Sequence, residues 1–519
     1  MNLLKKIKFS WLFFLFSLLF FVVTFYLVRS FMTNFDEMDH ISAVYLMSQG
    51  QKLYTDIFAT HFPFPFYLAY FSSPIWVNVS FAKAITNFHF TLALFYILIF
   101  ISTFFTLKKS SFRFMFSVWI IFLSLILSLY HGNLFLSETF AGILISAIFW
   151  ILIPSFIDKQ KLNSYSRILL IIFASLAAWT QPLFVLLIFI PIFISPPDKR
   201  FKTFLLATII NLIPLIYFAF SGQLIGFFQQ AILFNSNVYS HEFPEQVGNN
   251  SMFVQNIFDF FKNEFYLLTH FFTSTQIYQF ILNLTLLIFT FVILFKAKLI
   301  YKILFLILFL SLMSRQVKVN PGNIFNFGSY PLLLFSFACL LSFFYYFRNK
   351  FPKILIGILV LICFITVAYD FSPIFKQSLD PAYNYDVFWS YRQRIGEDIT
   401  KLTEANEKIL IYPHDPDLYF FSQRLPLDRF TYWYPWYDKV NEYKQERLSA
   451  LKNNSPAVIY YGGMVYKDNP KAYAEFFPNL LDNYINVIKD NETTNLWLRS
   501  DLQDRLQPLN FSSNFSANE

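Results

Sequence analysis

The chain has 519 residues, of which 56% are hydrophobic and only 14% are charged, and its mean hydropathy is +0.48. A soluble protein of this length needs far more polar residues to cover its core, so a soluble globular fold is excluded. The net charge of +8 does not indicate nucleic-acid binding, because the lysines and arginines separate apolar runs and do not form one patch.

Apolar runs long enough to cross about 30 Å of hydrocarbon recur from the start of the chain to about residue 370. The first run, 9–31, follows three lysines and ends without a small-residue cleavage site, so we expect an uncleaved span. Further spans are expected at 89–107, 113–130, 134–156, 203–221, 276–295, 303–314, 329–347 and 354–370. The stretch 168–195 is interrupted at Pro182 and predicts a hairpin of two short helices. The total is about eleven spans.

The basic residues predict how these spans are oriented. Six segments with three nearby lysines or arginines each fall on one side when 168–195 counts as two crossings. The positive-inside rule makes that side cytoplasmic, so the N-terminus is expected inside a multi-pass cell-membrane protein. Two long outer loops, 32–88 and 222–275, are expected to form interfacial helices or to cover a site.

After residue 371 the composition becomes that of a soluble domain. Short buried strands are predicted at 408–412 and 457–461, with a surface helix at 437–452 between them and a closing strand at 491–498. The predicted fold is therefore a polytopic α-helical membrane domain, 1–370, followed by a small extracytoplasmic α/β domain, 371–519.

The polar residues of the first outer loop are the strongest indication of chemistry. Asp36 and Glu37 lie just beyond the first span in FDEMDH (35–40), and GQKLYTD (50–56) and HFPFPFY (61–67) follow. A carboxylate at the membrane boundary can take a proton from an acceptor hydroxyl, and partial burial raises its pKa toward a useful range. The alternative interpretation is that Asp36 and Glu37 only cap and solubilise the outer end of the span.

The order of these elements resembles the GT-C glycosyltransferases, above all the bacterial relatives of the protein O-mannosyltransferases and the lipid A aminoarabinose transferase. The resemblance covers 9–70 well and the remaining spans only as a pattern of topology. It implies transfer of a sugar, with inversion, from a polyprenyl-phosphate carrier to an extracytoplasmic glycan, lipid or protein hydroxyl. It also implies that Asp36 is the general base and that Glu37 orients the acceptor or the Asp36 side chain.

The anionic leaving group of such a reaction needs a cation or a strong donor near the outer interface. Arg315 and Lys318, in a short outer segment, meet this need, and the alternative is that they snorkel at the end of a span. Additional candidate contacts to the substrate lie in other outer segments: His61, Lys52, Tyr54, Glu138 and, with similar standing, Gln181. Glu138 departs from the acidic pattern of the relatives, which is usually Asp.

No metal or other cofactor is predicted, because Asp36, Glu37, Asp39 and His40 are adjacent in sequence and their spacing does not give ligand geometry. Three other functions stay open. A ligase or polymerase of envelope polymers would use outer arginines and histidines, and a transporter would show inverted repeats and charges at mid-membrane. The third is a protein that keeps the GT-C fold for binding or scaffolding only, and no sequence feature excludes it. The predicted partners are the lipid-linked donor, the acceptor and the bilayer, without nucleic acid.

Overall fold

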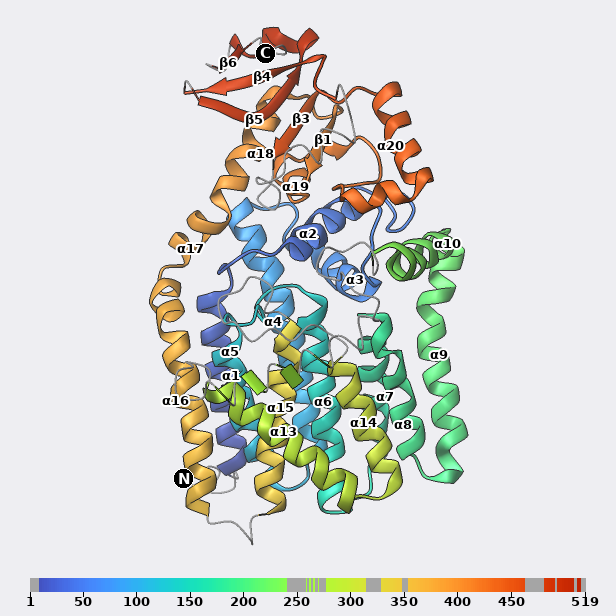
Figure 1. The fold of residues 1–519 in the computed structure, drawn as a ribbon, viewed down its shortest axis with the longest axis vertical. Helices are drawn as coiled ribbons and strands as arrows, with labels where there is room; N and C mark the ends of the chain where they lie inside the picture. Colours follow the sequence, from blue (N-terminus) through green and yellow to red (C-terminus); the bar gives the residue numbers. More distant parts are fainter. Residues whose placement is uncertain are drawn as a thin grey trace.

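The computed structural model describes residues 9–239, 277–313, 328–347, 353–462, 480–490, 492–507 and 511–514, with a few more between 258 and 269. The molecule is elongated, with a bundle of helices that continues into a C-terminal sheet at one end (Figure 1). Two helices of the loop 32–88 lie between the bundle and the sheet (Figure 1).

Seven helices in the described part of the chain are long and apolar enough to cross a membrane. They are α1 (Phe9–Val28), α4 (Phe81–Thr106), α6 (Ser137–Ile157), α9 (Pro197–Ser221), α13 (Ile277–Lys296), α15 (Ser329–Tyr346) and α16 (Lys353–Ser378). Shorter apolar helices are α5 (Ser110–Ile126), α7 (Ser164–Ala178), η3 (Pro182–Ile188) with α8 (Phe189–Ile194), and α14 (Leu299–Met313). The chain is therefore a polytopic helical membrane protein, as predicted. The count of about eleven spans stays a prediction, because the shorter helices fall below the usual length of about 20 residues.

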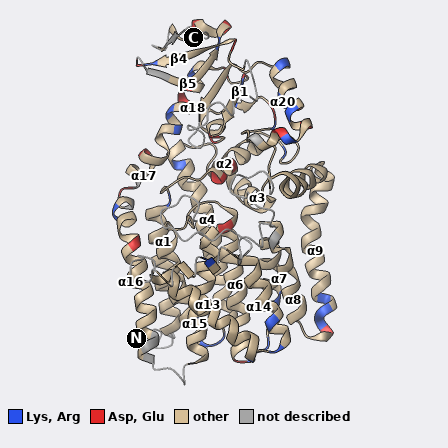
Figure 2. Cartoon of the chain, in the orientation of Figure 1, with Lys and Arg blue, Asp and Glu red and all other residues tan. Residues whose placement is uncertain are grey.

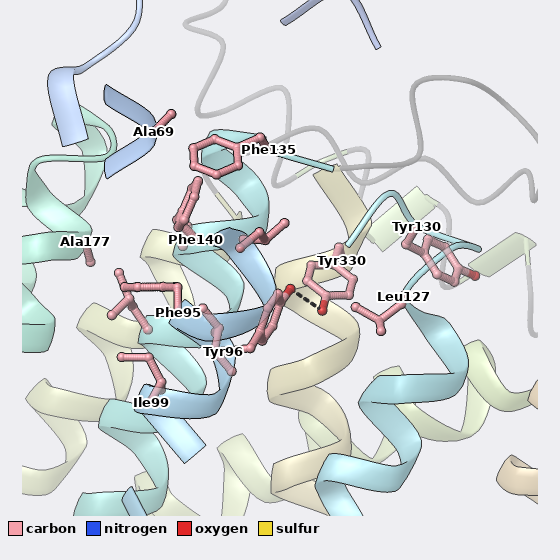
Figure 3. Packing of buried hydrophobic residues seen from close by; sticks show 14 of the residues in the cluster. Ala69, Phe95, Tyr96, Ile99, Leu127, Tyr130, Phe135, Phe140, Ala177 and Tyr330 are labelled. Atoms are coloured by element: carbon pink, nitrogen blue, oxygen red, sulfur yellow. Dashed lines mark hydrogen bonds between the residues drawn. The ribbon is translucent and has the colours of Figure 1, made fainter. Parts of the chain in front are cut away.

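Helices α6 and α15 form the centre of the bundle, and both are buried along most of their length. A Cβ added at Gly142 on α6 would lie 3.2 Å from the Cα of Pro331 on α15, so glycine permits this close approach. Tyr330 also lies beside Gly142, and Figure 3 shows its hydrogen bond to Tyr96, in which the two hydroxyls are 2.7 Å apart. Helices α9 and α16 are largely exposed and lie at the rim of the bundle, as expected of apolar helices that face lipid.

The predicted hairpin in 168–195 is present as two short helical segments. Helix α7 ends at Ala178, and the 3-10 helix η3 begins at Pro182 after an extended Gln181. Proline has no N–H to donate, so the helix restarts at the position where that donor is not needed. The second outer loop, predicted at 222–275, contains α10 (Leu224–Phe227) and the π-helix η4 (Phe228–Tyr239), and most of it after Tyr239 lies outside the described residues.

The C-terminal region contains a six-stranded sheet with strand order β2-β1-β3-β5-β4-β6. Its strands are β1 (Lys408–Pro413), β2 (Leu425–Pro426), β3 (Val458–Gly462), β4 (Tyr484–Lys489), β5 (Glu492–Arg499) and β6 (Phe511–Asn514). Strand β1 is parallel to β2 and β3, and the other pairs are antiparallel. The strands predicted at 408–412, 457–461 and 491–498 correspond to β1, β3 and β5. Helices α18 (Ser390–Leu402), α19 (Leu418–Ser422) and α20 (Asn441–Asn453) accompany the sheet.

The loop 32–88, predicted to be the first outer loop, contains α2 (Phe35–Ser48) and α3 (Pro63–Ser72). Asn34 caps α2, because its side chain accepts a hydrogen bond from the N–H of Asp36, and α3 starts at a proline. Helix α2 packs on α19, where the rings of Tyr45 and Phe420 are 6.0 Å apart. The loop thus connects the bundle to the sheet. Figure 2 shows acidic residues on α2, and basic residues at the end of α9 farthest from the sheet.

Candidate functional site

Asp36 lies in the first turn of α2, and its side chain is 32% exposed. The Nε2 atom of His61 is 3.6 Å from Asp36 Oδ1, and that imidazole is 25% exposed. His61 lies two residues before the start of α3, so the two helices of the loop bring these side chains together. The structure therefore joins two residues that the sequence analysis selected separately, and both are open to solvent.

Glu37 is fully buried and points to different neighbours. Its Oε1 atom is 2.9 Å from His89 Nε2 on α4 and accepts a hydrogen bond of 2.7 Å from the N–H of Phe135. His89 is also fully buried. Glu37 thus links α2 to α4 and to the segment that leads into α6, which is a positioning role. This arrangement holds the start of α2, and therefore Asp36, against the bundle.

Asp39 and His40 lie one turn after Asp36, and both are buried. Burial, together with the neighbouring Asp36, raises the pKa of Asp39 to about 7, and His61 partly offsets this. Burial also lowers the pKa of His40 to about 3, and His61 adds to the effect. The imidazoles of His40 and His61 are 5.6 Å apart. A neutral His40 and an Asp39 that titrates near neutral pH therefore lie behind the exposed pair.

The C-terminal region adds residues to the same place. His414 directly follows β1, and its ring is 4.4 Å from that of Phe35 in an edge-to-face contact. Burial lowers the pKa of His414 to about 4, while Asp36 is among the acids that favour its protonated form. The Arg392 guanidinium on α18 is 2.9 Å from Asp417 and 3.3 Å from Asp415. Burial raises the pKa of Asp417 to about 7, and Arg392 partly offsets this rise.

The sequence analysis missed these C-terminal residues, although one signal was present. Two charged or titratable residues, His414 and Asp415, follow the predicted strand 408–412. The carboxyl ends of parallel strands are where α/β sheets place functional groups, and β1 is parallel to both its neighbours.

Tyr54 and Lys52 support the loop that contains His61. The hydroxyl of Tyr54 donates a 2.7 Å hydrogen bond to the carbonyl of His61, and its ring is buried. The amine of Lys52 is exposed and donates to the carbonyl of Ser221, at the end of α9. The described contacts of Lys52 thus lie at the loop's junction with α9 and do not include Asp36 or His61.

Glu138 and Gln181, two other predicted residues, are brought together inside the bundle. Glu138 is in the first turn of α6, and its Oε1 accepts a 3.3 Å hydrogen bond from the amide of Gln181. Both side chains are buried. Arg315 and Lys318 lie outside the described residues. Within the described residues, no group of three or more His, Cys, Asp or Glu side chains could hold a metal ion.

Fold and site together define the class: a polytopic helical membrane protein in which the loop 32–88 and the C-terminal sheet bring acids and histidines together at one end of the bundle. No protein-family model matches the chain, and no curated protein matches it significantly.

Proposed function

We propose that the protein is a membrane glycosyltransferase that moves a sugar from a polyprenyl-phosphate carrier to an extracytoplasmic hydroxyl acceptor, with inversion. The acceptor oxygen forms a bond to the anomeric carbon while the bond from that carbon to the phosphate oxygen breaks. The phosphate leaves with the electron pair, and the proton of the acceptor passes to Asp36. The reaction therefore needs a positioned base and contacts to the leaving phosphate.

The observation that supports this proposal best is the exposure of Asp36. The acids Glu37 and Asp39 in the same helical turn are 0% and 3% exposed, whereas the Asp36 side chain is 32% exposed. A general base must come within hydrogen-bond reach of the hydroxyl that it deprotonates. Of these three acids, Asp36 meets that requirement, and His61 is close enough to orient its carboxylate.

The position of α2 also supports the proposal. The helix lies between the apolar bundle and the C-terminal sheet (Figure 1), where a lipid-borne donor and a water-borne acceptor could both reach it. In the proposed complex, His61 donates to the sugar or the phosphate. Arg315 and Lys318 keep the role that the sequence suggested for them, as cations for the leaving phosphate.

The test is incorporation of sugar by membranes that contain the full-length protein, with radiolabelled polyprenyl-phosphate sugars as donors. We expect Asp36→Asn to lower incorporation by at least about a hundredfold, which is the contribution of a general base. The matched control is Asp56→Asn, because Asp56 is an exposed acid of the same loop whose carboxylate accepts from the N–H of Lys52. An Asp36→Asn protein that incorporates as much sugar as the control would overturn the mechanism.

A further inference from the structure

A second polar feature lies at the opposite end of the bundle, where α7 and α9 begin. A cavity of about 340 Å³ opens there, a volume near the lower end of those that bind small ligands. Its polar lining consists of Ser164, Arg167, Asp198, Lys199, Lys202 and Thr203. The basic end of α9 in Figure 2 corresponds to this place, which is far from α2 and the proposed site.

The cavity has an excess of positive charge. Three cations and one acid line it, so its net charge is +2 when Arg167, Lys199 and Lys202 are counted against Asp198. In the described part of the chain, none of these three cations makes an ion pair with a carboxylate. By contrast, Lys109 outside the cavity pairs with Asp158 at 2.6 Å. The charge of the cavity is therefore available to an anion.

Apolar surface adjoins these cations. Ile168, Ile171 and Leu206 complete the lining, and Ile168 is 44% exposed. Phe201, one position before Lys202, is 75% exposed, which is typical of an aromatic side chain at the membrane interface. A ligand that fits this surface has an anionic head for the cations and hydrocarbon chains for the exposed face of α7 and α9.

We propose that this cavity binds the headgroup of an anionic membrane phospholipid at the end of the bundle predicted to be cytoplasmic. Arg167, Lys199 and Lys202 donate to the phosphate oxygens, and the acyl chains lie along the apolar face beside Ile168. Basic pockets between transmembrane helices on the cytoplasmic side bind such headgroups. This inference does not depend on the proposed glycosyl transfer.

The experiment uses the full-length protein in nanodiscs of phosphatidylcholine, with or without added phosphatidylglycerol, and reads lipid affinity by native mass spectrometry and thermal melting. The test variant combines Arg167→Gln, Lys199→Gln and Lys202→Gln. The matched control replaces three basic residues at the predicted cytoplasmic turn from the end of α13 to the start of α14, none of which lines the cavity: Lys296→Gln, Lys298→Gln and Lys302→Gln. A third variant, Asp198→Asn, removes the one acid in the lining.

We expect phosphatidylglycerol to stabilise the wild type and the control alike. We expect the test variant to bind it more weakly by on the order of tenfold or more, and Asp198→Asn to bind it several times more tightly. The proposal would be overturned if the test variant kept its affinity for phosphatidylglycerol, or if the test and control variants lost equal affinity. It would also be overturned if inorganic phosphate alone stabilised the protein as much as phosphatidylglycerol does. If the test variant does not fold, unchanged affinity in Asp198→Asn overturns it.

Discussion

Replacing Glu37 by alanine tests how the start of α2 is held in place. The Glu37 side chain is fully buried, and its Oε1 atom is the shared partner of His89 Nε2 and of the Phe135 N–H. Alanine would leave both groups buried without an acceptor. Each buried group without a partner costs about 1–3 kcal/mol, and the lost packing adds to this, so we expect a destabilisation of about 3–5 kcal/mol.

The assay is thermal melting of the purified full-length protein in detergent, where a loss of this size lowers the melting temperature by on the order of 5 °C. Glu37→Gln is the matched control, because its amide oxygen can accept both hydrogen bonds at the Oε1 position. The Oε2 atom of Glu37 makes no hydrogen bond within the described residues, so the amide nitrogen replaces no contact there. We expect the glutamine variant to melt much closer to the wild type than the alanine variant.

The comparison with Asp36→Asn separates the structural role of Glu37 from the proposed catalytic role of Asp36. Asp36 is partly exposed, so Asp36→Asn should melt like the wild type and lose only transfer activity. Glu37→Ala should lose stability first, with activity falling because α2 is displaced. A Glu37→Ala protein that melts at the wild-type temperature would show that the hydrogen bonds to His89 and Phe135 do not hold α2, and would refute the reasoning.

Three further changes test other parts of the site. Between about pH 4, where an unfolded Asp titrates, and pH 7, the folded protein keeps a proton on Asp39 that the unfolded chain has lost, so Asp39 makes stability fall as pH rises through that window. Asp39→Asn should remove this contribution in melting curves across pH, and an unchanged pH profile would contradict it. Gly396→Ala should lower the melting temperature clearly, because the new Cβ would lie 2.6 Å from the backbone carbonyl carbon of Phe421; wild-type melting would contradict the packing of α18 on α19. Tyr54→Phe removes the hydrogen bond to the His61 carbonyl, so it should cost about 1 kcal/mol in melting and lower activity; no change in either would contradict its supporting role.

The membrane class and most helices could be predicted, because apolar runs of the right length have few other stable states in a bilayer. The boundaries were less predictable where a helix continues past its apolar run. The second span was predicted to begin at residue 89, but α4 begins at Phe81, so His89 lies two turns inside the helix. Helix α16 likewise extends to Ser378, beyond the predicted start of the C-terminal domain at 371.

The site could be predicted only where it is local in sequence. Asp36 and His61 belong to one loop, and each could be selected from the sequence, but the structure alone shows that their side chains lie together. The partner of Glu37 could not be predicted, because His89 is 52 positions away in the sequence. Nothing in its local sequence distinguishes His89 from other polar residues at the end of a span. His414 and Arg392 join the site only because the sheet packs on α2, a tertiary contact that no local pattern contains.

The helical geometry of α2 explains how one short acidic run serves several roles. An α-helix turns by about 100° per residue, so Asp36, Asp39 and His40 lie near one another while Glu37 points elsewhere. Asp36 faces His61, and the charges of both residues affect the pKa of Asp39. Glu37 instead reaches His89 on α4. Because Asp36 and Glu37 are adjacent in sequence, they lie on different sides of α2 and have different roles. On one side of α2 the partly exposed carboxylate of Asp36 lies next to His61, and on the other side Glu37 connects the helix to the bundle through hydrogen bonds.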